Sequence, residues 1–191
     1  MILNHWFPTT IGISECPFIK EIQKPYKDII AKYEYTSSGF CTERVHLNKK
    51  FKKLNDWINQ EIKKYAEVHL YKDVYECKES WLLDYPIGGG QSFHRHPGFI
   101  FSAVFFLEGY EKDTSLNFEN PMIDMKNPLN QTAHHGNIKH KEIFNELTYN
   151  MCSYPPKTGN LIIWRSYLSH GCYNKELDCK RIVFTYNFDR V

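Results

Sequence analysis

The sequence predicts an α+β fold in which helices come first and a mostly β half follows, built on a sheet-based core or an open barrel. The main evidence is a change of hydrophobic period near residue 80, from steps of three and four residues to short β-rich runs. The aromatic content of 16% supports this, because Tyr and Phe favour strands and ring-lined interiors. A length of 191 residues fits one domain with one sizeable core.

Helical support is expected over residues 18–70. The strongest helix is predicted within residues 48–71, where apolar side chains recur mostly at steps of three and four and Lys and Glu occupy the other face. A helical pattern over residues 18–35 is interrupted by Pro25, which predicts two short helices or a helix and a turn. Before it, residues 3–17 alternate loosely around two prolines, which is typical of an edge strand.

The second half contains short runs bounded by Gly, Pro or Asn, which predict strands. These runs are SWLLDY (80–85), FIFSAVFFLEG (99–109), SLNFENP (115–121), GNLIIWRS (159–166) and RIVFTYNF (181–188). The polar segment 122–159 is too long for an ordinary connection, so we expect it to be a lid or to carry small elements of its own.

Charge and composition exclude several classes of protein. With 24 basic and 22 acidic residues, the balance argues against a nucleic-acid or membrane-surface partner. No apolar run reaches the roughly 18 residues that cross a membrane, and the N-terminus lacks a signal-peptide pattern. We therefore expect a cytoplasmic protein, in the host cytoplasm if a phage encodes it. The six cysteines form no C-x-x-C pair and are expected to be reduced thiols.

Two histidines, His94 and His96, follow three glycines and stand one residue apart. In an extended strand such side chains point to the same face, roughly 6 to 7 Å apart. Two neutral imidazoles on one face can bind one iron, zinc or copper ion, although a polar strand face also produces this pattern by chance. His170, just past an apolar strand, is either the third ligand or an ordinary loop residue.

Arg181 opens the last predicted strand, eleven residues after His170. It is either a surface cap or an inward-facing side chain, and the second alternative requires an anion to offset its desolvation. The connecting segment, YNKELDCK, has the length of a hairpin turn. We therefore expect Arg181 to point into the barrel at the same end of the sheet as His170.

Five segments, in this order, resemble the iron(II)- and 2-oxoglutarate-dependent oxygenases. The similarity is closest to the prolyl-hydroxylase-like branch and to members common in marine bacteria and their phages, and it covers residues 81–191. The matching segments are WLLDYPIGGGQSFHRHPG, SAVFFL, LNFENP, YPPKTGNLIIWRSYLSHGC and RIVFTYNF. The resemblance implies a double-stranded β-helix, or jelly-roll, over residues 78–191 within a single domain 1–191.

The resemblance also implies roles for individual side chains. His94, His96 and His170 would hold Fe(II). Arg181 would bind the distal carboxylate of 2-oxoglutarate, an anion that suits a guanidinium fork. Tyr85 matches a tyrosine that often reaches this cosubstrate.

Two positions depart from the common pattern of these oxygenases. Most members have Asp at the position of His96, so a neutral imidazole leaves the metal site one charge unit more positive. Phe106 stands where a tyrosine hydroxyl often assists the arginine. This second departure leaves any assistance to Arg181 to Asn187 or Ser102.

The implied activity is hydroxylation of a peptidyl or free amino acid, or of a small metabolite, by O2, with release of succinate and CO2 and with ascorbate as a supporting reductant. Two alternatives remain open from the residues alone. A three-histidine cupin would use iron or zinc without 2-oxoglutarate and would not need Arg181 to face inward. A non-catalytic jelly-roll binding module would carry no stoichiometric metal.

Overall fold

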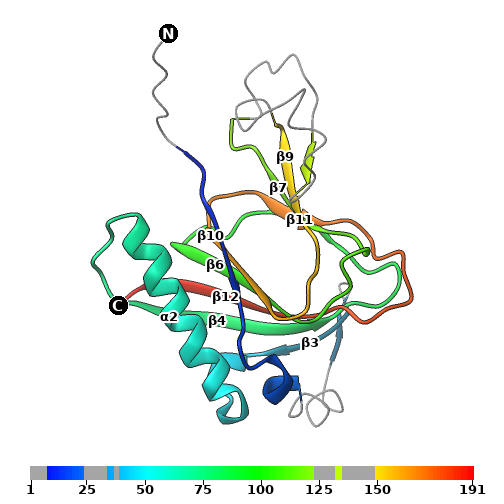
Figure 1. Ribbon diagram of the computed structural model, residues 1–191, viewed down its shortest axis with the longest axis horizontal. Coiled ribbons are helices and arrows are strands. Elements are labelled where there is room, and N and C mark those ends of the chain that lie inside the picture. Colours follow the sequence, from blue (N-terminus) through cyan, green and yellow to red (C-terminus); the bar gives the residue numbers. More distant parts are fainter. Residues whose placement is uncertain (1–7, 24–33, 37–38, 123–131, 135–148) are drawn as a thin grey trace.

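The strands form two sheets (Figure 1) in the computed structural model, which describes residues 8–23, 34–36, 39–122, 132–134 and 149–191. The larger sheet has seven strands in the order β1-β10-β6-β12-β4-β3-β2, and the smaller has five in the order β5-β11-β7-β9-β8. Strands of the larger sheet are β1 Ile11–Glu15, β10 Asn160–Arg165, β6 Phe101–Glu108, β12 Ile182–Arg190, β4 Tyr75–Asp84, β3 Gly39–Glu43 and β2 Glu34–Thr36. Strands of the smaller sheet are β5 Gln91–His94, β11 His170–Cys172, β7 Leu116–Glu119, β9 Met151–Tyr154 and β8 Thr132–His134.

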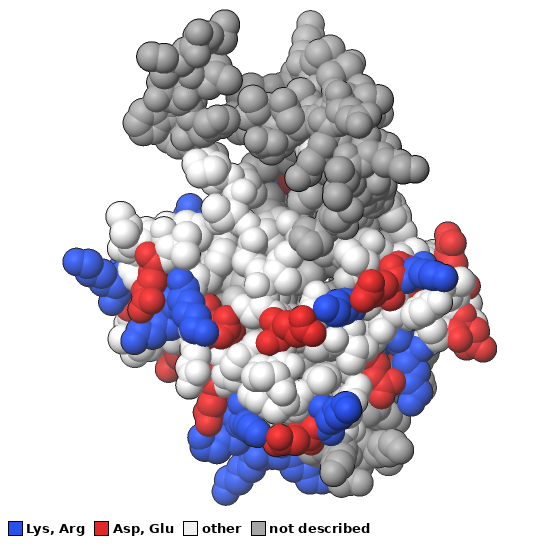
Figure 2. All heavy atoms as spheres, in the orientation of Figure 1, with Lys and Arg blue, Asp and Glu red and all other residues white. Residues whose placement is uncertain are grey.

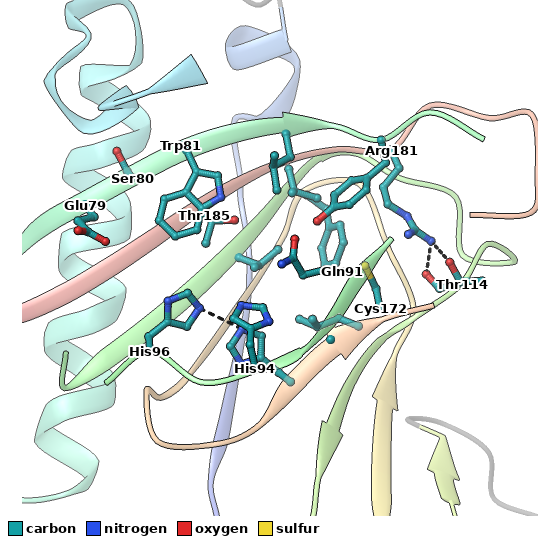
Figure 3. A pocket seen from close by; sticks show the side chains of 18 of the residues that line it. Glu79, Ser80, Trp81, Gln91, His94, His96, Thr114, Cys172, Arg181 and Thr185 are labelled. Atoms are coloured by element: carbon teal, nitrogen blue, oxygen red, sulfur yellow. Dashed lines mark hydrogen bonds between the residues drawn. The ribbon is translucent and has the colours of Figure 1, made fainter. Parts of the chain in front are cut away.

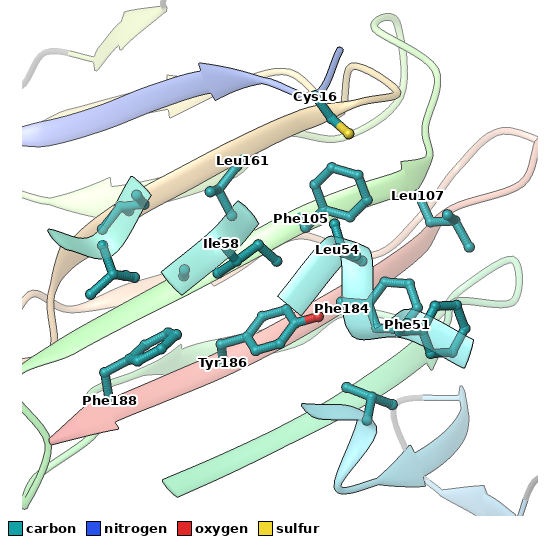
Figure 4. Close-up of a cluster of buried hydrophobic side chains, with 14 of the residues drawn as sticks. Cys16, Phe51, Leu54, Ile58, Phe105, Leu107, Leu161, Phe184, Tyr186 and Phe188 are labelled. Carbon is teal, nitrogen blue, oxygen red and sulfur yellow. The ribbon is translucent and has the colours of Figure 1, made fainter. Parts of the chain in front are cut away.

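The predicted amphipathic helix is confirmed as α2, Lys52–Val68, and it lies across the outer face of the larger sheet (Figure 1). Two short 3-10 turns, η1 Val45–Leu47 and η2 Lys49–Phe51, lead into it. Leu54 and Ile58 project from α2 into a cluster with side chains of β6, β10 and β12 (Figure 4). Burial of this apolar stripe is what holds the helix against the sheet.

β12 separates two apolar clusters, because successive side chains of a strand point to opposite faces. Phe184 and Tyr186 belong to the cluster under α2. Val183 and Thr185 line a cavity on the other side of the sheet, facing the smaller sheet. The same strand therefore supplies both the packing core and the wall of the site.

The N-terminal region contains more strand than predicted. The expected edge strand is confirmed as β1, which pairs with β10 at one end of the larger sheet. Residues 19–23 are helical, and the remainder of the Pro25-interrupted pattern, residues 24–33, lies outside the described residues. The expectation of helices throughout residues 18–70 is wrong for β2 and β3, which form a hairpin. β3 pairs with β4 and satisfies backbone groups that an open sheet edge would leave unpaired.

The polar segment 122–159 is described only in part. Its residues 151–154 form β9, which pairs with β7, so this end belongs to the smaller sheet. Residues 132–134 form β8, which runs parallel to β9. Residues 123–131 and 135–148 lie outside the described residues, and the role of a lid stays a prediction.

Charges of both signs are interspersed across the middle of the face shown in Figure 2, and Lys and Arg side chains gather at its lower edge. This distribution agrees with the formal charge of +2. Within the described part of the chain, every helix is too short or too polar to cross a membrane. Cys16, Cys77, Cys152, Cys172 and Cys179 are free thiols, as the sequence predicts.

Replacing Ile58 with valine is expected to lower the free energy of unfolding by about 0.5 to 1.5 kcal/mol, because one methylene is lost from a fully packed position. Ile58 is 0% exposed, whereas Val68 on the same helix is 72% exposed. Val68→Ala is the matched control, and we expect it to change the free energy by no more than about 0.5 kcal/mol. Denaturant unfolding followed by circular dichroism measures both, and equal losses would contradict the assigned burial.

Candidate metal centre and cosubstrate pocket

Three imidazoles meet where the smaller sheet faces the larger one. His94 ends β5, His170 begins β11, and the two are directly opposite each other in the antiparallel pairing. Their ring centroids are 4.4 Å apart, and the ring of His96 stacks on that of His170 at 5.0 Å. One nitrogen from each of the three rings lies within 4.8 Å of the other two, which allows a single metal ion to contact all three.

Backbone carbonyls orient two of these rings. Nδ1 of His94 lies 2.8 Å from the carbonyl oxygen of Ser92, and Nδ1 of His170 lies 3.0 Å from that of Leu168. Metal-binding histidines usually have this support. Nδ1 donates its proton to the carbonyl oxygen, and Nε2 keeps a lone pair for the metal. Burial lowers the pKa of His170 to about 3 and that of His96 to about 4. Both rings are therefore neutral near pH 7, the form that binds a metal.

The position of His96 has a different cause from the one predicted. β5 ends at His94, so the two histidines do not project from one strand face. His96 lies in the following turn, where its backbone N–H donates to the carbonyl of Ser166 at 3.1 Å. The rings of His94 and His96 still lie 4.9 Å apart. A tertiary contact, rather than strand periodicity, brings His96 to the site.

A cavity of about 580 Å³ lies between the sheets and is lined by all three histidines. Val104, Phe106 and Leu116 contribute apolar walls. Arg181 lies at one end beside Thr114, while Glu79 and Trp81 lie toward the other end (Figure 3). The three imidazoles therefore share one cavity with a guanidinium group.

Arg181 faces this cavity and is only 2% exposed, so the prediction that it points inward agrees with its position. Its Nη2 donates to the backbone and side-chain oxygens of Thr114 and lies 2.9 Å from Oδ2 of Asp113. The ring of Tyr85 lies 5.6 Å from the guanidinium carbon. Among the described residues, Nε and Nη1 of Arg181 have no hydrogen-bond partner. Two adjacent buried nitrogens with unpaired N–H groups fit a carboxylate.

Asp113 is a site residue that the sequence did not reveal. Its side chain is completely buried and is the internal counterion of Arg181. In the sequence it lies in the charged stretch EGYEKDTS, where an acidic residue resembles a solvated loop residue. The sequence argument correctly required an anion for a buried arginine, but part of that requirement is met within the chain.

Ser102 and Asn187 are buried, but they do not contact Arg181 as expected. Asn187 lies 3.1 Å from Nδ1 of His96, and Ser102 donates to Asn187 at 2.9 Å. Asn187 is six residues from Arg181 along an extended strand, a span of roughly 20 Å. Both side chains therefore belong to the histidine end of the site rather than to the guanidinium end.

The hairpin expected between His170 and Arg181 is not formed. β11 lies in the smaller sheet and β12 in the larger, so the intervening residues cross from one sheet to the other. The prediction assumed that consecutive strands pair, which holds for a hairpin but not for strands that alternate between two layers. Both residues still line one cavity, because the two sheets face each other.

Solved structures share this arrangement of strands. The chain is similar to a prolyl-4-hydroxylase from Pseudomonas putida, with a TM-score of 0.63 and 11% identity over 96% of this chain and 94% of that one. It is similar to the viral collagen prolyl hydroxylase of Paramecium Bursaria Chlorella virus-1 in its 2-oxoglutarate complex, with a TM-score of 0.61 and 10% identity over 95% and 96%. For HygX from Streptomyces hygroscopicus with nickel, 2-oxoglutarate and hygromycin B bound, the TM-score is 0.60 at 11% identity over 96% and 84%. These similarities show the fold, a double-stranded β-helix.

The fold, with clustered imidazoles and a buried guanidinium in one cavity, fits the iron(II)- and 2-oxoglutarate-dependent oxygenases, most of which have Asp where this chain has His96. The chain belongs to the family described as "Putative 2OG-Fe(II) oxygenase", whose model matches residues 79–187. That range contains the three histidines, Arg181 and Asn187. The protein is therefore an oxygenase that uses Fe(II), 2-oxoglutarate and O2. A search of curated proteins found no match.

Proposed function

We propose that the protein hydroxylates an amino acid, free or peptidyl, or a small metabolite. In this proposal His94, His96 and His170 hold Fe(II), and Arg181 binds the distal carboxylate of 2-oxoglutarate. The observation that supports it is the convergence of three imidazole nitrogens within 4.8 Å in the same cavity as a guanidinium, two of whose nitrogens have no hydrogen-bond partner among the described residues. Imidazole nitrogen suits iron, and a buried guanidinium suits a carboxylate.

Bound Fe(II) supplies the chemistry that couples O2 reduction to decarboxylation of 2-oxoglutarate and oxidation of the substrate. The chain supplies position and environment. The three histidines would hold the ion at the wall of the cavity that they line. Arg181 and Tyr85 orient the cosubstrate at one end of the cavity. Apolar side chains such as Phe106 restrict water near the metal position.

The substrate is proposed to enter from the end of the cavity away from Arg181. Glu79 and Trp81 lie at that end (Figure 3), and Arg44, whose backbone N–H donates to the carbonyl of Ser80, lines the same cavity. Arg44 and Glu79 are exposed to solvent. Arg44, Glu79 and Trp81 offer a cation, an anion and a flat aromatic surface. This combination matches the carboxylate, amino group and side chain of a free amino acid.

A succinate-release assay tests the proposed function. The protein is incubated with Fe(II), ascorbate, 2-oxoglutarate and a panel of amino acids, short peptides and small metabolites. We expect succinate formation to depend on iron and O2 and to rise with one class of substrate, whose product gains one oxygen atom by mass spectrometry. Substrate oxidation that proceeds equally well without 2-oxoglutarate would contradict the proposed use of the pocket at Arg181.

His96→Asp is expected to retain metal binding within roughly tenfold of the wild type, because a carboxylate is the usual third ligand beside two histidines. The nearby amide of Asn187 can donate to that carboxylate. We also expect more succinate formed in the absence of substrate, since the charge on the metal site changes. His96→Ala is the comparison, because it supplies no ligand. Equal metal affinity in the two variants would show that position 96 is not a ligand position.

A further inference from the structure

A chain of hydrogen bonds runs through Asn187 to the histidines. Oγ of Ser102 lies 2.8 Å from Oγ of Ser166 and donates to Oδ1 of Asn187 at 2.9 Å. Nδ2 of Asn187 lies 3.1 Å from Nδ1 of His96, and Nε2 of His96 lies 3.2 Å from Nε2 of His170. Ser102, Ser166 and Asn187 are all 0% exposed, so solvent does not compete for these contacts.

The direction of these hydrogen bonds decides which ring nitrogen of each histidine carries the proton. A carbonyl oxygen only accepts, so Nδ1 of His170 carries its proton toward Leu168 and its Nε2 keeps a lone pair. The contact between the two Nε2 atoms then requires the proton of His96 to be on Nε2. The amide nitrogen of Asn187 only donates, so Nδ1 of His96 must accept, which agrees with the same assignment.

This tautomer of His96 is not the one that binds a metal through Nε2. A metal ligand needs a lone pair there, and its other nitrogen normally donates to an acceptor. His96 meets both conditions only if its proton moves to Nδ1 and an oxygen replaces the amide nitrogen opposite. Half a turn of the Asn187 side-chain amide makes that exchange, because it swaps Oδ1 and Nδ2.

The surrounding groups tolerate this rotation. The hydroxyls of Ser102 and Ser166 can both donate and accept. The same contacts can therefore form with donors and acceptors exchanged. The rotation replaces the longer contact, 3.5 Å from Nδ2 of Asn187 to Oε2 of Glu79, with two facing oxygen atoms, but Glu79 is exposed to solvent and its side chain can turn away. A carboxylate in place of His96 would not need the Asn187 amide to rotate, because an ionised carboxylate has no tautomers.

We propose that Asn187 is a positioning residue that decides whether His96 becomes the third metal ligand, and that its amide rotates when the ion binds. This inference rests on the proposed metal-binding role of the three histidines. The inference links the histidine at position 96, where the usual residue is aspartate, to the amide of Asn187 beside it.

Nuclear magnetic resonance of protein carrying ¹⁵N-labelled histidine reads the tautomers directly, with Zn(II) as a diamagnetic probe. Without metal we expect His94 and His170 as Nδ1–H tautomers and His96 as the Nε2–H tautomer. With Zn(II), all three should be Nδ1–H with metal-shifted Nε2 signals. If His96 keeps its Nε2 proton while the other two respond, the role of Asn187 is overturned and the metal centre stands. If none responds, both are overturned, and an Nδ1–H tautomer of His96 before metal addition also overturns the proposal.

Variants at position 187 provide a second test through Zn(II) affinity. Asn187→Asp only accepts, so we expect the Nδ1–H tautomer of His96 before metal addition and affinity at least equal to wild type. Asn187→Leu removes the acceptor, and affinity should fall roughly 10- to 100-fold. Asn55→Leu is the matched control, because Asn55 is also buried and bonded, to Tyr186 and the carbonyl of Val45, away from the site. It should not change Zn(II) affinity.

The Zn(II) affinities of the position-187 variants can support or overturn the role of Asn187. Wild-type affinity in Asn187→Leu, or an equal loss in Asn187→Leu and Asn187→Asp, would overturn the proposal. If Asn187→Leu does not fold, the decision rests on Asn187→Asp, whose His96 tautomer before metal addition must differ from that of the wild type.

Discussion

Tight divalent-metal binding is expected to be lost when His170 is replaced with alanine. Its ring lies 4.4 Å from that of His94 and 5.0 Å from that of His96, which are themselves 4.9 Å apart, so its removal leaves a pair with no third ligand. The loss should exceed the roughly 10- to 100-fold effect of removing a group that only supports a ligand. Calorimetric titration with Ni(II) measures it, and iron-dependent succinate formation should disappear with it.

His69→Ala is the matched control for that change. His69 is partly buried and, like His170, hydrogen-bonded, to Oγ1 of Thr10 at 2.8 Å and to the carbonyl of Tyr65 at 2.8 Å, but it lies at the end of α2. We expect it to leave metal affinity unchanged. The ring of His170 also packs on Trp164, so circular dichroism must first show that the variant is folded. Tight Ni(II) binding by folded His170→Ala protein would mean that the third ligand is assigned wrongly.

Loss of the Arg181 charge is expected to weaken binding of 2-oxoglutarate by about 2 to 4 kcal/mol, or roughly 30- to 700-fold. Arg181→Ala alone is a poor test, because it would leave the buried carboxylate of Asp113 without its counterion and destabilise the fold. The double variant Arg181→Gln, Asp113→Asn removes both charges together. Titration of the Ni(II)-loaded variant with 2-oxoglutarate measures the loss, and Ni(II) affinity itself should be nearly unchanged.

Asp113→Asn alone separates the two partners. It keeps the N–H groups of Arg181 and removes the negative charge that competes with an incoming carboxylate. We expect it to bind 2-oxoglutarate at least as tightly as the wild type. Because the buried guanidinium then lacks its counterion, 2-oxoglutarate should raise the melting temperature more than in the wild type. Unchanged 2-oxoglutarate affinity in the double variant would show that Arg181 does not bind the cosubstrate.

Much of the fold is legible in local patterns. The 3.6-residue period of α2 follows from burial of one face of the helix, and the short, mostly apolar runs of β6 and β12 follow from burial of both faces of these strands. Those patterns are local, so they can be recognised in the sequence without knowledge of long-range contacts. The hairpin of β2 and β3 was missed because its pairing with β4, a long-range contact, stabilises it more than its own short sequence does.

The sequence by itself determined the chemistry available to this protein: two imidazoles at positions 94 and 96, a third at 170, an arginine at 181, and the order of segments in which oxygenases carry them. Only the tertiary structure decided how these groups work together. It placed β11 and β12 in facing sheets, buried Asp113 against Arg181, and set Asn187 beside His96 rather than beside the arginine. The physical reason is that a side chain's charge, tautomer and partner depend on the groups packed around it, and packing between sheets joins residues that no spacing along the chain relates.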